Sequence, residues 1–400
     1  MSNTTTVSAA GPSQGAKAPS GGSEVRAATS AGVTSSPFWS TGIDRLKAYV
    51  PGEQPQSDGW VKLNTNECPY PPSPLALAAI REATSEKLRL YPDPNGTALK
   101  AAIGKQFGLG SDHVFLGNGS DEVLGHAFMG LLKHELPILY PDISYSFYPV
   151  WCGLYGIAYK QVPLNAEFGV DVADYAQPNG GIVLPNPNAP TGTALSLEAL
   201  RTLLQANRQS VVLIDEAYVD FGAQSAAALI PEFDNLLVVH TLSKSRALAG
   251  LRVGFALGHP TLIEALARVK DSFNSYPLDR LALVGAQAAI EDTAYLAQLT
   301  SAVIHSRDWL IAELAGLGFD TLPSQANFIF TRHANRLAAT LLAQLREQKI
   351  LVRHFTQARI ANHLRISIGT QAECELLVQA LQRILAAQPD QKNEVSAGIS

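Results

Sequence analysis

Short runs of apolar residues, separated by segments long enough to be helices, recur through the middle of the chain. They are Val114–Leu116, Ile138–Tyr140, Ile182–Leu184, Val211–Ile214, Leu236–His240 and Val253–Leu257. Such runs are apolar on both faces, which is typical of strands in a parallel sheet covered by helices. Between two of them, leucines at 197, 200, 203 and 204 recur at helical spacing. The sequence therefore predicts an α/β fold with a mainly parallel central sheet.

The pattern changes near residue 295 and predicts a second, smaller α+β domain. A long helical stretch is followed by Phe328–Thr331, a helix carrying Leu337, Leu341 and Leu345, and then Leu364–Ile368. The first 36 residues are mostly Ser, Thr, Ala and Gly, with too little apolar surface to offset the entropy of ordering. We expect five parts: a disordered tail at 1–36, an arm at 37–75 joining the small domain, a large domain at 76–294, the small domain at 295–388 and a tail at 389–400.

Composition excludes several classes of function. The 30 basic and 35 acidic residues give a net charge of −5, which argues against a protein that mainly binds nucleic acid or anionic lipid. The apolar runs are far shorter than the roughly 18 residues of a membrane span, so we expect no membrane partner. The cysteines Cys68, Cys152 and Cys374 form no CxxC pair. Free thiols in a reducing cytoplasm are the simplest interpretation, and no metal site is expected.

Two charged residues follow neighbouring apolar runs. Asp215 ends the strand-like segment Val-Val-Leu-Ile-Asp, and Lys244 lies in Thr-Leu-Ser-Lys-Ser just after the next run. Ligands of open α/β sheets bind beyond the carboxyl ends of strands, so both side chains point to a candidate site. Apolar neighbours and the nearby Arg246 and Arg252 favour a lowered lysine pKa and a usable amine. Taken singly, Asp215 could equally be a helix cap, and Lys244 an ordinary loop lysine.

A glycine-containing turn, Gly117-Asn-Gly-Ser-Asp-Glu, follows the first apolar run and opens a predicted helix. Backbone N–H groups at such a helix start can bind a phosphate, although a plain N-cap by Ser120 or Asp121 is the commoner explanation. Glu122 replaces the third glycine of a dinucleotide fingerprint, and no GxxxxGK[ST] motif occurs. A nicotinamide-dependent dehydrogenase is therefore disfavoured.

Together, in their order and spacing, these motifs resemble the pyridoxal-phosphate enzymes of the aspartate aminotransferase type, and among them most closely the histidinol-phosphate aminotransferases. The resemblance runs from about Ile43 to Leu385 and centres on Thr241–Gly250, which matches the family's lysine signature in full. The other matching segments are Lys62–Pro69, Tyr91-Pro92, Asn188–Gly192, Asp215–Tyr218 and Leu364–Gly369. The fold implied is that of the pyridoxal-phosphate-dependent transferases, a mainly parallel sheet flanked by helices plus a smaller α+β domain.

The resemblance implies a pyridoxal 5′-phosphate cofactor and assigns residues to it. Lys244 would bind the cofactor as a Schiff base and then act as general base and acid for the α-proton. Asp215 would pair with the protonated pyridine nitrogen and keep the ring an electron sink. Tyr218 would reach the phenolic oxygen, and Tyr145 would stack on the ring.

The phosphate of the cofactor would be bound at the helix start. The resemblance assigns it to the backbone of Ser120 and Asp121, with Ser243 and the guanidinium of Arg252. Tyr91 would reach a phosphate across a subunit interface, which implies a homodimer with a shared active site. Many relatives have Asn directly before Pro-Thr-Gly, where this chain has Ala189, so Asn188 would bind the cofactor oxygen only if the loop shifts by one residue.

Substrate residues are implied in the same way. Arg365 matches the arginine that binds the carboxylate of glutamate or 2-oxoglutarate. Arg353 and Tyr49 match positions that help to bind the substrate phosphate, and Asn66 lies in the segment expected beside the substrate. Cys68 replaces the more usual Asn before Pro69, also close to the expected substrate.

The activity implied is transfer of an amino group between L-histidinol phosphate and 2-oxoglutarate, giving imidazole acetol phosphate and glutamate. An aromatic-amino-acid aminotransferase or a threonine-phosphate decarboxylase would carry the same lysine, aspartate and phosphate cup. A regulator that retains the fold without catalysis is a third possibility. Against it, no DNA-binding module is apparent, and Lys244, Asp215 and Arg365 are all present.

Overall fold

A computed structural model describes residues 36–387 of the chain. The tails expected at 1–36 and 389–400 lie outside this range, apart from Ser36. The chain divides into two compact units, and the boundary between them falls between Leu46 and Lys47. The described part of the first unit contains a 3-10 helix, Ile43–Arg45, and everything below concerns the second unit.

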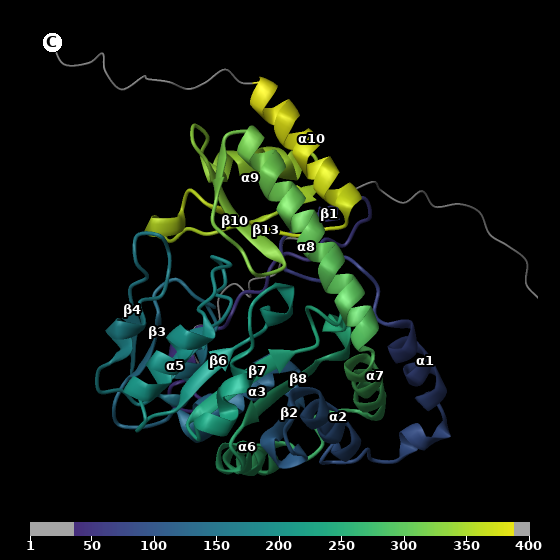
Figure 1. Cartoon of the computed structure of the whole chain (residues 1–400), viewed down its shortest axis with the longest axis vertical. Helices are drawn as coiled ribbons and strands as arrows, with labels where there is room; N and C mark the ends of the chain where they lie inside the picture. Colours follow the sequence, from purple (N-terminus) through teal and green to yellow (C-terminus); the bar gives the residue numbers. More distant parts are fainter. Residues whose placement is uncertain (1–35, 388–400) are drawn as a thin grey trace, which may run out of the picture. The chain divides into compact units, whose positions relative to one another are not determined.

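The larger sheet has seven strands within the described residues, in the order β2-β8-β7-β6-β5-β3-β4 (Figure 1). Its strands are β2 (Val114–Asn118), β3 (Ile138–Pro141), β4 (Tyr159–Val162), β5 (Ile182–Pro185), β6 (Val212–Asp215), β7 (Leu236–Thr241) and β8 (Val253–Gly258). Neighbouring strands from β7 to β4 pair in parallel, whereas β8 runs antiparallel to both β2 and β7. The predicted α/β fold with a mainly parallel sheet is therefore confirmed.

All six predicted apolar runs form strands of this sheet, but two features were not predicted. The edge strand β4 is exposed at its first three residues, so it lacks the double-sided apolar pattern that marks the other strands. The reversed direction of β8 was also not predicted, because an apolar run carries no information about strand direction.

Helices cover both faces of the larger sheet. They are α1 (Pro74–Ala83), α2 (Thr97–Phe107), α3 (Gly119–Leu131), α4 (Tyr148–Tyr155), α5 (Leu197–Ala206), α6 (Pro260–Phe273) and α7 (Arg280–Glu291). Alternate residues of β6 enter two different cores, because side chains of a strand point to opposite faces. Val212 and Ile214 join the core that includes residues of α1, α2, α5 and α7, whereas Leu213 joins the core that includes residues of α3, α4 and α6.

A third core forms around two smaller sheets. The four-stranded sheet has the order β12-β13-β10-β9, and β1 pairs with β11 in parallel. These elements are β1 (Val61–Lys62), β9 (Phe319–Thr321), β10 (Phe328–His333), β11 (Ile350–Leu351), β12 (Arg353–His354), β13 (Leu364–Ser367), α8 (Thr293–Gly316), α9 (Ala338–Glu347) and α10 (Gln371–Ala387). Leu63 from the arm is buried in this core with Leu341 and Leu377. Leu337 caps α9 rather than starting it, and the predicted domain boundaries stay predictions.

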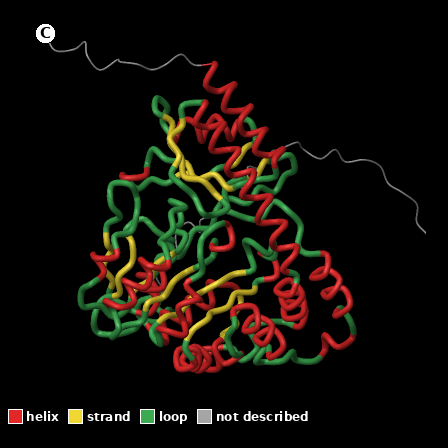
Figure 2. The backbone as a smooth tube through the Cα atoms, in the orientation of Figure 1, coloured by secondary structure: helices red, strands yellow, loops and turns green. Residues whose placement is uncertain are grey.

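Figure 2 shows loops between the larger sheet and the smaller sheets. Several of these loops leave the carboxyl ends of parallel strands, where the sequence predicts the site. Among residues 36–387, no helix combines the length and apolar character needed to cross a membrane.

Candidate active site

A cavity of about 310 Å³ lies at the carboxyl ends of the central strands. Asp215 is the last residue of β6, and Lys244 follows β7 by three positions. Ser120 and Asp121 open α3 directly after β2. Because β8 runs antiparallel, its first residue lies at this same edge, which brings the preceding Arg252 to the cavity.

The structure brings nearly all predicted site residues to this one cavity. Its lining includes Tyr49, Asn66, Ser120, Asp121, Tyr145, Asp215, Tyr218, Ser243, Lys244, Arg252, Arg353 and Arg365. Tyr91 and Asn188 are the predicted residues that do not line it. The residues come from the larger sheet, from the arm and from the four-stranded sheet, so the site depends on the packing of all three.

Asp215 is a buried carboxylate with no ion-pair partner among the described residues. Its side chain accepts a hydrogen bond from the Tyr148 hydroxyl at 2.9 Å and one from the Ala217 amide at 3.3 Å. Burial raises the pKa of Asp215 from 3.8 to about 6, although both hydrogen bonds act to lower it. A buried carboxylate held this way fits a cationic hydrogen-bond donor in the cavity, such as a protonated ring nitrogen.

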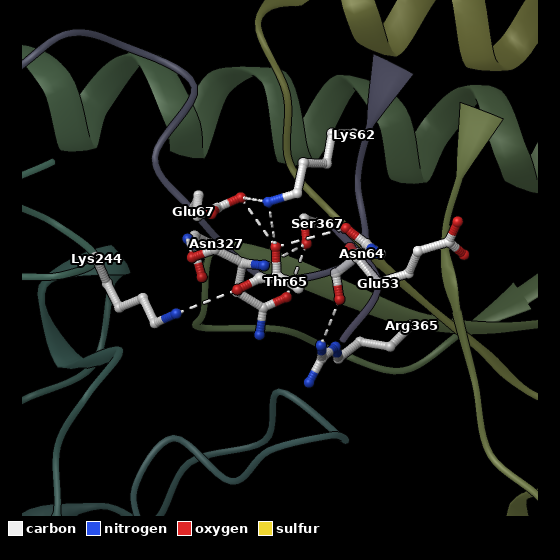
Figure 3. A network of polar contacts seen from close by, with 10 residues as sticks. Glu53, Lys62, Asn64, Thr65, Glu67, Lys244, Asn327, Arg365 and Ser367 are labelled. Atoms are coloured by element: carbon white, nitrogen blue, oxygen red, sulfur yellow. Dashed lines mark hydrogen bonds and ion pairs between the residues drawn. The ribbon is translucent and has the colours of Figure 1, made fainter. Parts of the chain in front are cut away.

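The amine of Lys244 is held by backbone and an aromatic ring. Its Nζ donates to the carbonyl oxygen of Thr65 at 3.2 Å (Figure 3). The same atom lies 5.8 Å from the centre of the Tyr218 ring. The Tyr218 hydroxyl in turn accepts from Nδ2 of Asn66 at 3.1 Å. Lys244 forms no ion pair among the described residues, so its amine is available for covalent chemistry.

The start of α3 forms a tight cradle beside Arg252. Gly119 has a φ of +78°, and a Cβ there would overlap the Arg252 guanidinium. A Cβ at Gly254 would overlap the backbone of Gly119 and the amide nitrogen of Ser120. Arg252 donates to the Asp121 carboxylate at 3.2 Å, and the Tyr145 hydroxyl donates to the same carboxylate at 3.1 Å. Helix N–H groups next to a guanidinium suit a phosphate.

Two arginines lie opposite each other on the wall of the cavity that the four-stranded sheet forms, called the far wall below. Arg353 of β12 pairs in register with Arg365 of β13, and both guanidiniums approach the ring of Phe355, at 5.9 and 5.8 Å. Arg365 donates to the carbonyl oxygen of Asn64 at 2.8 Å, while its Nε is buried without a hydrogen-bond partner. Burial lowers the pKa of Arg365, but a guanidinium stays charged. A buried donor left without a partner fits an anionic ligand.

The two predicted residues outside the cavity have other contacts. Tyr91 is 78% exposed and stacks on Tyr276 with the ring centres 4.6 Å apart. Asn188 is buried, and its Nδ2 donates to the Ile143 carbonyl and to the Thr191 hydroxyl. The cofactor contacts expected of Tyr91 and Asn188 stay predictions.

Sequence reasoning did not identify Tyr148 or Thr65. Tyr148 belongs to the same Ser-Tyr-Ser-Phe-Tyr segment as Tyr145, so a search for further hydroxyls in that segment could have found it. Thr65 contributes a backbone carbonyl, which every residue carries, so no sequence signal exists for it.

The site fits the pyridoxal phosphate that the sequence analysis expects. The cradle suits its phosphate, the buried Asp215 suits its ring nitrogen, and Lys244 lines the same cavity as both. The donors and acceptors thus match the chemistry of the cofactor at each point. Within residues 36–387, no group of three His, Cys, Asp or Glu side chains could hold a metal ion.

Comparison with known proteins places the chain and its fold in one class. The sequence model of the family "Aminotransferase class I and II" matches residues 58–381. The solved structure of histidinol-phosphate aminotransferase from Sinorhizobium meliloti, in complex with pyridoxal-5′-phosphate, has a TM-score of 0.74 and 26% identity. That alignment covers 82% of this chain and 91% of the solved one.

Relatives with higher sequence identity narrow the class to one family. "Histidinol-phosphate aminotransferase 1" from Pseudomonas fluorescens is 60% identical over 86% of this chain and 99% of its own length. Histidinol-phosphate aminotransferase from Gluconacetobacter diazotrophicus is 60% identical over 88% of this chain and 99% of its own length. The chain therefore belongs to the class I and II aminotransferases and, within them, to the histidinol-phosphate aminotransferase family.

Proposed function

We propose that the protein transfers the amino group of L-histidinol phosphate to 2-oxoglutarate, giving imidazole acetol phosphate and glutamate, a step of histidine biosynthesis. One observation carries the proposal: a single cavity holds the Lys244 amine and the buried Asp215 carboxylate at one end and two arginines at the other. A substrate that carries both an amine and a distant anion suits that arrangement. The relatives of about 60% identity named above support the choice of substrate.

Lys244 is the proton-transfer residue in this proposal. Pyridoxal phosphate, when bound, supplies the electron sink that accepts the electron pair left on Cα of the donor. Lys244 Nζ would move the proton from that Cα to C4′ of the cofactor in the first half of the reaction, and in the second half it would move a proton from C4′ to Cα of the new amino acid. Asp215 hydrogen-bonds the proton on the ring nitrogen, and Tyr148 and the Ala217 amide orient its carboxylate. Tyr218, itself held by Asn66, donates to the phenolic oxygen.

The other proposed cofactor residues bind and orient. The backbone at Ser120 and Asp121, the Ser243 hydroxyl and the Arg252 guanidinium hold the phosphate. Tyr145, whose hydroxyl is fixed on Asp121, packs against the ring. Asn188 supports the loop that brings Ala189 to the cavity wall through its bonds to Ile143 and Thr191.

The far wall selects the substrates. Arg365 pairs with the carboxylate of 2-oxoglutarate through its unpartnered Nε, while its contact with Asn64 fixes the guanidinium plane. Arg353 and Tyr49 bind the phosphate of the amino donor, and Asn66 lies beside the reacting carbon. Arg365 is half-buried and its Nε is buried, which limits the access of water to the pair and strengthens it.

A homodimer completes the proposal. Tyr91 is exposed and lies outside the cavity of its own chain, which suits a residue that serves a partner's site.

The three free cysteines suit a reducing compartment, so we place the enzyme in the cytoplasm.

The test is an absorbance spectrum of the purified protein loaded with pyridoxal phosphate, recorded before and after L-histidinol phosphate is added without any keto acid. We expect the visible band of the Lys244-bound cofactor to disappear and to return when 2-oxoglutarate is added. A band that ignores histidinol phosphate but is bleached by phenylalanine or tyrosine would move the assignment to an aromatic-amino-acid aminotransferase. If no band forms at all, the role of Lys244 is wrong.

A further inference from the structure

The segment Asn64–Glu67 connects the two ends of the cavity. Its carbonyl oxygens at Asn64, Thr65 and Asn66 accept hydrogen bonds from three side chains that come from three separate parts of the chain. These donors are Arg365, Lys244 and Asn327, at 2.8, 3.2 and 3.0 Å, and Figure 3 shows them converging on the segment. The backbone of this segment is therefore in direct contact with both the proposed base, Lys244, and the proposed carboxylate-binding residue, Arg365.

The same segment carries one charged side chain, the carboxylate of Glu67, which lines the cavity and is held by Lys62. Lys62 Nζ donates to the Thr65 hydroxyl at 2.8 Å and pairs with Oε2 of Glu67, and the Thr65 hydroxyl donates to the same oxygen at 2.9 Å (Figure 3). The Lys62 side chain is 22% exposed and does not line the cavity, whereas the Glu67 side chain is 42% exposed and does. Lys62 thus reaches Glu67 from outside the cavity.

Glu67 is the acidic group of the cavity wall that the proposed mechanism does not use. Asp215 meets the ring nitrogen, and Asp121 is paired with Arg252. Burial opposes ionisation of Glu67, but the bonds from Lys62 and Thr65 and the charges of Lys62 and Lys244 together hold its pKa below the ordinary value. Glu67 is therefore an anion at neutral pH, in a cavity whose proposed substrates are themselves anions.

We propose that Lys62 is a positioning residue that neutralises Glu67 on the cavity wall and so keeps the cavity attractive to doubly charged anions. A bare carboxylate here would repel a dicarboxylate or a phosphate, because charges at short range in a partly buried site are weakly screened. Lys62 acts through Glu67 and touches neither substrate nor cofactor. The choice of substrates in the test rests on the proposed function, whereas the charge balance of the wall does not.

The test compares loaded wild-type enzyme with Lys62→Met, Lys62→Arg, Glu67→Gln and the double variant Lys62→Met/Glu67→Gln. Two quantities are measured: kcat and KM for 2-oxoglutarate, and the Kd of maleate, an unreactive dicarboxylate, from its effect on the visible absorption of the bound cofactor. We expect Lys62→Met to raise both KM and Kd by about 3- to 10-fold with kcat within about 2-fold. Lys62→Arg keeps the charge and should restore wild-type values.

The double variant separates charge from structure. If Lys62 neutralises Glu67, removal of both charges returns KM and Kd to within about 2-fold of wild type. If the double variant is as impaired as Lys62→Met, or if Lys62→Met changes nothing, the proposal is wrong. The maleate measurement needs no turnover of histidinol phosphate, so it tests Lys62 even if the proposed substrate fails.

Discussion

The two ends of the cavity are built in different ways. The cofactor end is assembled at one edge of the larger sheet: Asp215 ends β6, Lys244 follows β7, and Ser120 follows β2. The substrate end joins the arm segment Asn64–Glu67 to Arg353 and Arg365, residues nearly 300 positions later in the chain. The first end is local to one fold element, whereas the second exists only when distant parts of the chain pack together.

This difference has a chemical counterpart. The groups proposed to make or break bonds to the substrate stand at the edge of the buried larger sheet, where small displacements are costly. The groups proposed to select the substrate stand on the four-stranded sheet and the arm. The comparison predicts that changes at the cofactor end mainly lower kcat, and that changes at the substrate end mainly raise KM.

The largest expected effect is that of Lys244→Ala. Without the amine no group of the chain is placed to move the α-proton, so kcat should fall by about 10⁴-fold or more. Steady-state assays with L-histidinol phosphate measure kcat, and equilibrium dialysis checks that pyridoxal phosphate still binds at the cradle. Turnover close to wild type would contradict the assignment and with it the separation of the two ends.

Asp215→Ala should have the next largest effect, a loss in kcat on the order of 10²- to 10³-fold, because the ring nitrogen loses its anionic partner. The variant also leaves the buried Tyr148 hydroxyl without its acceptor. Tyr148→Phe is the matched control: it removes the hydroxyl but keeps the carboxylate, so its kcat should stay within about tenfold of wild type. Equal losses in both variants would mean that the hydrogen-bond pair, and not the charge, matters.

The cofactor end was largely predictable from sequence, and the difference in construction explains why. Asp215 and Lys244 adjoin apolar runs, and these runs predict the strands. Parallel strands place their carboxyl ends at the same edge of the sheet. Arg353 and Asn66 could be proposed only through resemblance, because no local pattern says that β12 faces the arm. The orientation of the Asn188 amide and the direction of β8 depend on tertiary contacts, and periodicity does not encode them.

Because the pKa of Asp215 is raised in the fold, the free energy of unfolding of the cofactor-free protein should depend on pH. In the unfolded chain the pKa is near 3.8, and in the fold it is about 6, so the folded state binds the proton more tightly. The contribution of Asp215 to stability is then fully present below pH 3.8 and is lost as the pH rises through 6. The shift corresponds to about 3 kcal/mol over that window.

Asp215→Asn is the control for this effect, since it keeps a hydrogen-bond acceptor for Tyr148 but does not titrate. Urea unfolding of both cofactor-free proteins between pH 4 and 8 should show the wild type losing stability relative to the variant as the pH rises. Parallel curves would mean that Asp215 is not desolvated as the structure indicates. Added pyridoxal phosphate should reverse the trend if its ring nitrogen is cationic.

The smallest effects should come from variants at the substrate end, and each variant should raise KM for a different substrate. Arg365→Ala removes a buried charged donor, so KM for 2-oxoglutarate should rise by about 10- to 100-fold with a smaller change in kcat. Arg353→Ala should instead raise KM for L-histidinol phosphate by about tenfold and leave that for 2-oxoglutarate nearly unchanged. Because the two arginines are cross-strand neighbours that share contact with Phe355, a nonspecific disturbance of the wall would raise both constants in both variants. Steady-state kinetics with each substrate varied in turn distinguishes these outcomes. Opposite preferences would show that neighbouring residues on one small sheet select different substrates, whereas matching losses would mean that the two arginines do not divide the substrates between them.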